Sequence, residues 1–314
     1  MTPPDRPATE LPALTPRLAT NPYSWGVHAV AGADVVLPVE RVLGEMAGLG
    51  LHATELGHVG WLPLDAPALD AALDAHGLRL IAGFASLALH GASWTQARAS
   101  AEQVARTVGG AGGELLVIEL VADDVGSCVE LHEGVWSRVR ERLGAVARIA
   151  AGAGLRLALH PHAGSLVERE QDIARIAEYV DVDWCLDTGH ILLGGWSPAA
   201  FARTYGARVA HVHLKDADAA LAARLRAGEL TLLEATHAGL IVPLGQGDAE
   251  IAEVVRVLDE HAYDGWLVIE QPAALDAVPP PGRGPVEAMR ASIDFIAALD
   301  RARKTAVATT ARVR

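Results

Sequence analysis

The chain has 314 residues and carries 39 acidic against 26 basic side chains, which gives a formal net charge of −13 with histidine neutral. This excess of acid argues against a nucleic-acid binder, because a protein that binds phosphates needs a basic surface. Apolar residues make up 51% of the chain but aromatic residues only 4%, so the core must consist mainly of Ala, Val, Leu and Ile. A chain of this length can bury one large core or two modest ones.

The cysteines and the first residues bear on the compartment. Cys128 and Cys185 lie far apart in the sequence and indicate no disulfide framework, as expected in a reducing compartment. The N-terminus lacks the basic and then apolar order of a signal peptide, and no apolar run reaches the roughly 18 residues that a membrane span needs. We therefore expect a cytoplasmic protein that binds neither membranes nor nucleic acid.

The two ends of the chain differ from its middle. Residues 1–20 are rich in Pro, Thr and Ala without periodicity, and residues 303–314 resemble them. We expect a disordered N-terminal tail over 1–20 and a flexible C-terminal tail over 303–314. Residues 21–302 show no break in composition and are expected to form one catalytic domain.

Short β-type runs alternate with longer helical patterns through this domain. The helical stretches carry apolar residues three or four positions apart, as at Val139, Leu143, Val146 and Ile149. Strands are predicted at 24–28, 53–56, 79–84, 114–120, 155–160, 184–187, 209–214 and 266–270.

Eight strands, each followed by a helix, predict a single (β/α)8 TIM barrel, for which about 250 residues is typical. The extra length is taken up by the tails and by an insertion over 217–247. A doubly wound open sheet is the competing fold. It is disfavoured because no Gly-x-Gly-x-x-Gly turn follows the first strand and because polar residues mark the C-terminal ends of the strands.

One predicted strand carries three polar side chains in register. Because side chains alternate along a strand, His211, His213 and Lys215 share one face, and the apolar residues between them share the other. A lone buried histidine is most often a packed core residue, but three buried polar groups each need a partner. We therefore expect this face to point into the barrel.

Four consecutive predicted strands deliver groups that bind metals, namely His160, Asp187, His213 and Glu270. Nitrogen and carboxylate oxygen ligands without a thiolate suit first-row divalent ions. Because the C-terminal ends of barrel strands meet at one rim, these residues predict a site there for one divalent ion. We expect Mn²⁺ or Co²⁺ ahead of Zn²⁺, Fe²⁺ or Mg²⁺.

Several motifs connect these residues to a known family. They are Asn-Pro-Tyr-Ser-Trp-Gly at 21–26, Thr-Glu-Leu-Gly at 54–57, Gly-Trp-Leu-Pro at 60–63, His-Pro-His-Ala-Gly at 160–164, Leu-Asp-Thr-Gly-His at 186–190, His-Leu-Lys-Asp at 213–216, Leu-Gly-Gln-Gly-Asp at 244–248 and Trp-Leu-Val-Ile-Glu-Gln at 266–271. With them the chain resembles the xylose isomerase-like TIM barrel superfamily over roughly residues 20–300, and within it the inosose dehydratases.

The resemblance implies that Asp187, His213 and Glu270 bind the metal. Many members of the superfamily supply a glutamate from the fifth strand, whereas His160 stands at that place here, so that His160, His162 or Glu168 completes the metal shell. The implied reaction is the dehydration of 2-keto-myo-inositol, also called scyllo-inosose, to a trihydroxycyclohexane-dione in inositol catabolism. It needs no redox cofactor, and its partner is a small polyol ketone or keto-sugar.

Such a dehydration removes a proton next to a ketone and assists the departure of a β-hydroxide. His190 is the leading candidate to contact the substrate and move the proton, with His162 as the alternative, because imidazole has a pKa near 6.5. Lys215 is one of only two lysines, with Lys304, in a chain that otherwise uses arginine. We expect it to stabilise an enolate oxygen or to act as a base.

Further residues stand where a substrate pocket is expected. Glu55, His28, Trp25 and Trp61 are predicted to contact the substrate, with Phe84 as another aromatic wall. His28 occupies a position where the family pattern suggests an acidic residue, and Pro272 likewise replaces an aspartate. Glu119 is interpreted as structural, and Cys185 as a small buried apolar residue.

Three other functions stay open at this point. A keto-sugar isomerase or epimerase that acts through an enediolate uses the same metal, so only a product assay separates it from a dehydratase. An enzyme like endonuclease IV needs a basic groove and a trinuclear zinc cluster, and the net charge of −13 disfavours it. A catalytically inactive barrel that serves as a binding module predicts no bound metal. All of them are compatible with a homo-oligomer.

Overall fold

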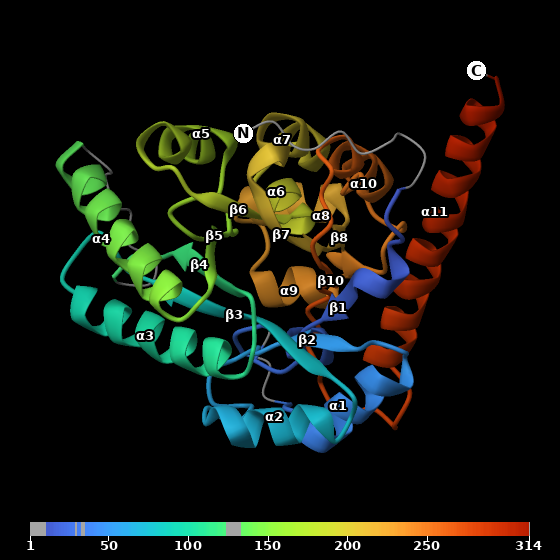
Figure 1. Ribbon diagram of the computed structural model, residues 1–314, viewed down its shortest axis with the longest axis horizontal. Coiled ribbons are helices and arrows are strands. Elements are labelled where there is room, and N and C mark those ends of the chain that lie inside the picture. Colours follow the sequence, from blue (N-terminus) through green and yellow to red (C-terminus); the bar gives the residue numbers. More distant parts are fainter. Residues whose placement is uncertain (1–10, 29, 33–34, 124–132, 314) are drawn as a thin grey trace.

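A computed structural model describes residues 11–28, 30–32, 35–123 and 133–313, so Cys128 lies outside the described residues. Eight parallel strands close into a barrel in the order β1-β10-β7-β6-β5-β4-β3-β2, and helices surround it (Figure 1). This confirms the predicted (β/α)8 barrel. The barrel strands are β1 (Leu18–Thr20), β2 (Ala53–Glu55), β3 (Arg79–Leu87), β4 (Leu115–Leu120), β5 (Arg156–Leu159), β6 (Asp183–Asp187), β7 (Val209–Leu214) and β10 (Leu267–Ile269).

The helices bury an apolar face against these strands. The main apolar core lies between the two layers and includes Val104, Leu143 and Ile176 from three different helices. Among the described residues, no helix is both long enough and apolar enough to cross a membrane. The helices are α1 (Val39–Gly48), α2 (Ala66–Asp74), α3 (Trp94–Gly110), α4 (Glu133–Gly152), α5 (Glu170–Tyr179), α6 (Thr188–Leu193), α7 (Pro198–Tyr205), α8 (Ala219–Arg226), α9 (Leu232–His237), α10 (Ile251–Glu260) and α11 (Pro285–Val313).

The first strand differs from the prediction. Strand β1 is Leu18–Thr20, which pairs with both β10 and β2, whereas residues 22–25 form a short 3₁₀ helix. The prediction of a strand over 24–28 was therefore wrong, because Leu18–Thr20 lies in a stretch rich in Pro, Thr and Ala that shows no strand pattern. The barrel also begins inside the expected tail over 1–20. At the other end, α11 continues to Val313 through the expected tail over 303–314.

The predicted insertion over 217–247 forms a small unit beside the barrel mouth. Strands β8 (Asp216–Ala217) and β9 (Ile241–Val242) pair in antiparallel fashion and enclose α8 and α9. A small apolar cluster that includes Leu193, Ala222 and Leu240 holds the unit against α6. The insertion is therefore a folded element of the rim.

A single buried carboxylate fixes this unit. Asp216 is 1% exposed, and its two oxygens accept hydrogen bonds from the backbone N–H groups of Ala217, Gly245, Gly247 and Ala249 at 2.8–3.1 Å. Replacing the carboxylate by a methyl group would leave several of these N–H groups without partners. Asp216 thus holds the loop that closes the insertion.

We predict that Asp216→Ala lowers the free energy of unfolding by about 3 kcal/mol, because bonds to a charged acceptor are lost together. The matched control is Asp218→Ala. It removes the N-cap of α8, in which the carboxylate accepts a bond of 2.8 Å from the N–H of Leu221, and should lower the free energy of unfolding by about 1 kcal/mol. Urea denaturation measures both changes. Equal losses in the two variants would contradict the role given to Asp216.

Candidate metal and active site

The floor of the site is a layer of mostly small apolar side chains inside the barrel. This layer takes residues from all eight strands: Ala19, Ala53, Ile81, Ala82, Leu115, Val117, Ala158, Cys185, Ala210 and Val268. Residues two apart on a strand share a face, so the next inward position lies towards the C-terminal rim. Six strands place a polar residue there, each at most 8% exposed: Asn21, Glu55, Glu119, His160, Asp187 and Glu270.

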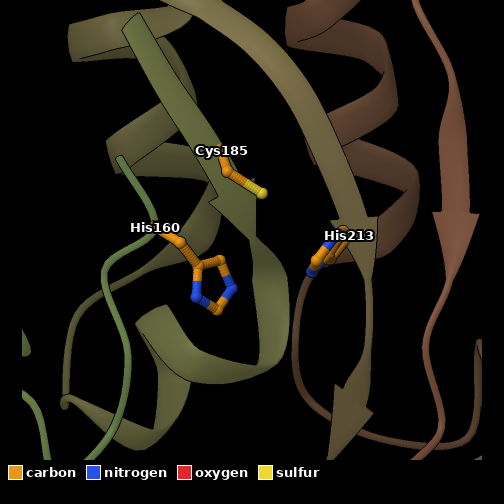
Figure 2. A group of neighbouring side chains, drawn as sticks. All are labelled: His160, Cys185 and His213. Atoms are coloured by element: carbon orange, nitrogen blue, oxygen red, sulfur yellow. The ribbon is translucent and has the colours of Figure 1, made fainter. Parts of the chain in front are cut away.

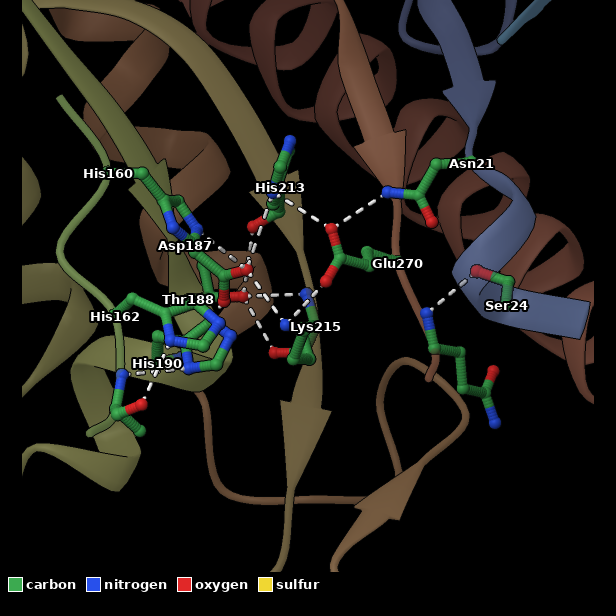
Figure 3. Close-up of polar contacts among 12 residues, drawn as sticks. Asn21, Ser24, His160, His162, Asp187, Thr188, His190, His213, Lys215 and Glu270 are labelled. Carbon is green, nitrogen blue, oxygen red and sulfur yellow. Dashed lines mark hydrogen bonds and ion pairs between the residues drawn. The ribbon is translucent and has the colours of Figure 1, made fainter. Parts of the chain in front are cut away.

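Three neighbouring strands bring a carboxylate, an imidazole and an ammonium group together (Figure 3). His213 Nδ1 lies 3.0 Å from Glu270 Oε2 and 3.5 Å from Asp187 Oδ2. The Lys215 ammonium lies between the same two carboxylates, 3.1 Å from Asp187 Oδ2 and 2.7 Å from Glu270 Oε1. The predicted shared face of His213 and Lys215 is thus confirmed.

The Asp187 carboxylate has two separate tasks. Its Oδ1 accepts a hydrogen bond of 2.9 Å from the N–H of His190 and caps helix α6, which begins at the next residue. Its Oδ2 faces Lys215, His213 and His160. Because the cap fixes the rotamer, Oδ2 is held towards the cluster before any ligand binds.

A second layer of bonds orients His213. Its Nε2 lies 3.0 Å from Glu55 Oε1, which also receives His211 Nε2 at 2.7 Å. A carboxylate can only accept here, so His213 carries a proton on Nε2, and its Nδ1 is the nitrogen that faces Glu270 and Asp187. Asn21 donates through Nδ2 to Glu55 Oε2 at 2.9 Å and to Glu270 Oε2 at 2.8 Å, and so ties the two carboxylates together.

These residues fit a divalent cation. Glu55, Asp187 and Glu270 are three buried carboxylates, and Lys215 is the one permanently charged cation that pairs with any of them among the described residues. His213 Nδ1 lies near two carboxylate oxygens without making a hydrogen bond. Converging carboxylates and an imidazole lone pair, with a carboxylate behind the imidazole, are typical of a metal site.

The electrostatics keep the carboxylates ionised. Burial would raise the pKa of the Asp187 and Glu270 carboxyls, but the Lys215 ammonium and the neighbouring histidines together outweigh it and hold both pKa values well below the usual range. For Glu55, His213 and His211 likewise outweigh burial and lower the pKa. Burial lowers the pKa of His160 to about 4 despite the raising effect of Asp187. The carboxylates are therefore ionised and His160 is neutral near pH 7. Burial would lower the pKa of His213, but its neighbours, with the Glu55 and Glu270 carboxylates among them, raise it well above the ordinary value.

His160 lies beside this cluster, with Nε2 3.4 Å from Asp187 Oδ2. His160, Cys185 and His213 can each offer an atom within 4.8 Å of the others (Figure 2). Burial raises the pKa of the Cys185 thiol to about 11, so the thiol stays protonated. A protonated thiol is a poor metal ligand, and Cys185 packs as the small buried side chain that was expected.

Two further imidazoles lie next to the cluster (Figure 3). The ring centroids of His162 and His190 are 3.8 Å apart, and His162 Nδ1 lies 3.1 Å from Glu119 Oε2. Ser86 Oγ donates to Glu119 Oε1 at 2.6 Å. Burial, followed by His162 and Lys215, lowers the pKa of His190 well below its usual value, so His190 is neutral.

Most of these groups line one cavity of about 290 Å³ at the C-terminal mouth of the barrel. The predicted residues that line it are His28, Glu55, His160, His162, His190, His213, Lys215 and Glu270, whereas Asp187 is not among the lining residues. Its walls include apolar side chains from the rim and the insertion, namely Val30, Phe84, Leu193, Leu232 and Ile241. The cavity therefore combines one charged end with apolar sides.

Three expected residues are not brought to this cavity. Trp25 is completely buried, and its indole N–H donates to Glu45 on α1 at 2.8 Å. The indole N–H of Trp61 donates to a backbone carbonyl, and neither Trp61 nor Glu168 is among the described residues that line the cavity. The expectation of substrate contacts by the two tryptophans fails because both rings pack outside the barrel interior.

Four residues of the site were missed or misread. Asn21 follows a strand too short to recognise, although it opens the Asn-Pro motif. Glu119 contacts His162 and is more than structural packing, and its position at a strand end was the available signal. Ser86 and His58 could not be found from the sequence, because contacts with distant segments place them in the site. Pairing of β3 with β4 places Ser86 beside Glu119, and the ring centroids of His58 and His28 lie 4.3 Å apart.

We predict that Gly189→Ala disturbs Lys215 directly. A Cβ at residue 189 would lie 2.5 Å from both Cγ and Cδ of Lys215, so the lysine must leave the Asp187 and Glu270 carboxylates. Overpacking of this kind should cost about 1–3 kcal/mol in unfolding free energy. Gly48→Ala is the control, because nothing lies within 4 Å of a Cβ there. Chemical denaturation compares the two, and equal stabilities would contradict the close packing.

Comparison with known proteins places this geometry in a family. The family model of the xylose isomerase-like TIM barrel matches residues 43–299. An inosose dehydratase of Geobacillus kaustophilus is 28% identical over 268 residues, which cover 81% of this chain and 86% of that protein.

Solved structures share the fold at low sequence identity. An L-ribulose 3-epimerase matches with a TM-score of 0.71 at 17% identity and covers 95% of this chain and 99% of its own. The IolI protein, solved with a zinc atom, matches with a TM-score of 0.67 at 16% identity and covers 90% of this chain and 98% of its own. The chain belongs to the xylose isomerase-like TIM barrel family.

Proposed function

We propose that this protein is a metal-dependent hydro-lyase that dehydrates a neutral ring ketone of the inosose type. The observation that carries the proposal is the convergence of buried, ionised Asp187 and Glu270 on His213 Nδ1, next to the paired imidazoles of His162 and His190. Similarity to an inosose dehydratase over 81% of the chain supports the reaction class.

The ligands proposed for the metal are Asp187, His213 and Glu270, with His160 completing the shell. The distance of 3.4 Å between His160 Nε2 and Asp187 Oδ2 supports His160 over His162, because His160 and not His162 belongs to the groups of described residues whose ligand atoms converge. A bound divalent ion supplies Lewis-acid stabilisation of the negative charge that develops on a carbonyl oxygen. A zinc atom in the related fold of IolI supports such a site, and Mn²⁺ and Co²⁺ are proposed here.

The cavity favours an uncharged substrate. Among the described residues that line it, Lys215 is the one side chain with a permanent positive charge, and both of its partners are carboxylates. Apart from the proposed metal ion, the described lining residues offer a phosphate or carboxylate on the substrate no cation that is not already paired with a carboxylate. A polyol ring has uncharged hydroxyls for the polar end and C–H faces for apolar walls such as Phe84 and Leu232.

The chain's own groups supply proton transfer and orientation. His162 and His190 line the cavity as imidazoles that are proposed to exchange a proton with the substrate. Lys215 is proposed to donate a hydrogen bond to a substrate oxygen while it stays near Glu270. His28 and Glu55 are proposed to contact substrate hydroxyls. None of these roles requires a redox cofactor.

The test is turnover of 2-keto-myo-inositol by protein that has been stripped with a chelator and reloaded with Mn²⁺, Co²⁺ or Zn²⁺. We expect ultraviolet absorbance from a conjugated diketone to appear. Mass spectrometry should show that the substrate has lost one water. A product that keeps the mass of the substrate would instead identify an isomerase or epimerase. Absence of turnover with every metal would refute the proposed dehydration.

Two substitutions should separate metal binding from chemistry. Glu270→Gln should lose both bound metal and activity, because a charged ligand becomes neutral. Lys215→Met should keep the metal, which brings its own charge to the carboxylates, and lower kcat by about 10²- to 10⁴-fold. Elemental analysis and kinetics measure both. Lys304→Met, at the half-exposed other lysine, is the control. Metal loss in Lys215→Met with retention in Glu270→Gln would contradict the assignment.

A further inference from the structure

The backbone of one residue fixes the protons of both free imidazoles. His162 Nδ1 lies 2.9 Å from the carbonyl oxygen of Ala163, and the N–H of Ala163 donates to His190 Nδ1 at 3.2 Å. A carbonyl can only accept and an amide N–H can only donate, so His162 carries a proton on Nδ1 and His190 does not. In their uncharged forms, the two rings therefore hold opposite tautomers.

The consequence appears at the second nitrogen of each ring. Neither Nε2 atom makes a hydrogen bond to another described residue, and both side chains line the cavity. With its proton on Nδ1, His162 presents a bare Nε2 that accepts a proton. With its Nδ1 lone pair occupied, His190 presents an Nε2–H that donates. One ring is thus arranged as a base and its neighbour as a hydrogen-bond donor.

Glu119 strengthens the arrangement on the His162 side. Its Oε2 lies 3.1 Å from His162 Nδ1, so this nitrogen faces two acceptors at once. Its other oxygen accepts from Ser86 Oγ at 2.6 Å, which holds the carboxylate between strands β3 and β4. Glu119 is only 8% exposed. A carboxylate behind an imidazole fixes the tautomer and ring orientation and raises the basicity of the far nitrogen.

We propose that Glu119, held by Ser86, is a positioning residue that makes His162 the base of the reaction and leaves His190 as the donor to a substrate oxygen. This inference rests on the proposed dehydration for its chemistry, although the tautomers themselves do not. It goes beyond the sequence, which favoured His190 for proton transfer and gave Glu119 no part in it.

In the proposed reaction, His162 both removes a proton from the substrate and returns it. His162 Nε2 takes the proton from the carbon next to the ketone, and the C–H electron pair forms an enolate whose oxygen accepts a bond from His190 Nε2–H. His162 then returns that proton to the β-hydroxyl, which leaves as water with its C–O electron pair. The enolate pair becomes the new C=C bond. His162 ends as it began, and nothing is oxidised or reduced.

The kinetic test is a double-mutant cycle on metal-loaded enzyme. Glu119→Gln should lower kcat by about 10- to 100-fold with KM changed less than about twofold, and Glu119→Asp should recover part of the loss. His162→Gln should lower kcat by about 10²- to 10⁴-fold. The double variant should be no slower than His162→Gln alone, because Glu119 acts through that imidazole. Exchange of the α-proton with D₂O, followed by NMR, should fall in parallel.

Controls exclude a purely structural effect. Glu114→Gln removes a carboxylate beside Arg79, just before the opposite end of β4, and should leave kcat and the melting temperature unchanged. If Glu119→Gln does not fold, Ser86→Ala provides the milder perturbation, with an expected loss in kcat of about twofold to fivefold. Additive effects of Glu119→Gln and His162→Gln, or a change confined to KM or to melting temperature, would overturn the proposal.

A spectroscopic arm does not depend on turnover. In protein labelled with ¹⁵N-histidine, long-range ¹H–¹⁵N spectra distinguish Nδ1–H from Nε2–H, with His162→Gln and His190→Gln as assignment variants. We expect Nδ1–H for His162, Nε2–H for His190, and a shift towards Nε2–H at His162 in Glu119→Gln. Wild-type protein with the Nε2–H form of His162 would overturn the inference. The expected tautomers together with no turnover would refute the proposed reaction alone.

Discussion

The site depends on keeping three carboxylates ionised inside a barrel that excludes water. Glu55, Asp187 and Glu270 are each at most 8% exposed, and burial by itself would protonate them. Lys215 and the two histidines of β7 reverse that tendency for these groups. The cluster is stable because each charge has a partner, and removal of one partner would leave another buried charge uncompensated.

An apolar layer inside the barrel lies beneath these charged groups. Eight strands contribute mainly small apolar residues to a floor inside the barrel, and six of them add a polar residue two positions later. The polar residues of the next layer therefore converge from several strands above this apolar floor.

Local backbone geometry then gives each polar group a direction. The N-terminus of α6 fixes Asp187 through one oxygen and leaves the other for the cluster. Gly189 leaves the space that the stem of Lys215 occupies, and Thr188 exchanges hydrogen bonds with the backbone of the same lysine. Ala163 orients the imidazoles of His162 and His190 through its carbonyl oxygen and its N–H group. Side chains that carry chemistry are therefore oriented by residues that carry none.

The sequence by itself determined the barrel and most of its rim. Alternation along β7 predicted the common face of His211, His213 and Lys215, and the polar ends of long strands identified His160, Asp187 and Glu270. These predictions succeeded because they rest on local periodicity and on the rule that the C-terminal ends of parallel strands meet. The same logic failed for β1, whose residues lie in a stretch rich in Pro, Thr and Ala, and for Trp25, whose side chain faces away from the barrel interior.

Only the tertiary structure decided how these residues are paired. Asn21 donates hydrogen bonds to both Glu55 and Glu270, although Glu270 lies 249 positions away in the sequence. Glu119 contacts His162 from the neighbouring strand. The tautomer of an imidazole depends on which acceptor or donor lies within hydrogen-bonding distance of each nitrogen. Strand register and the path of the loops determine those neighbours. Residue type and spacing therefore specify which groups reach the rim, whereas the contacts between distant segments decide which of them hold a proton.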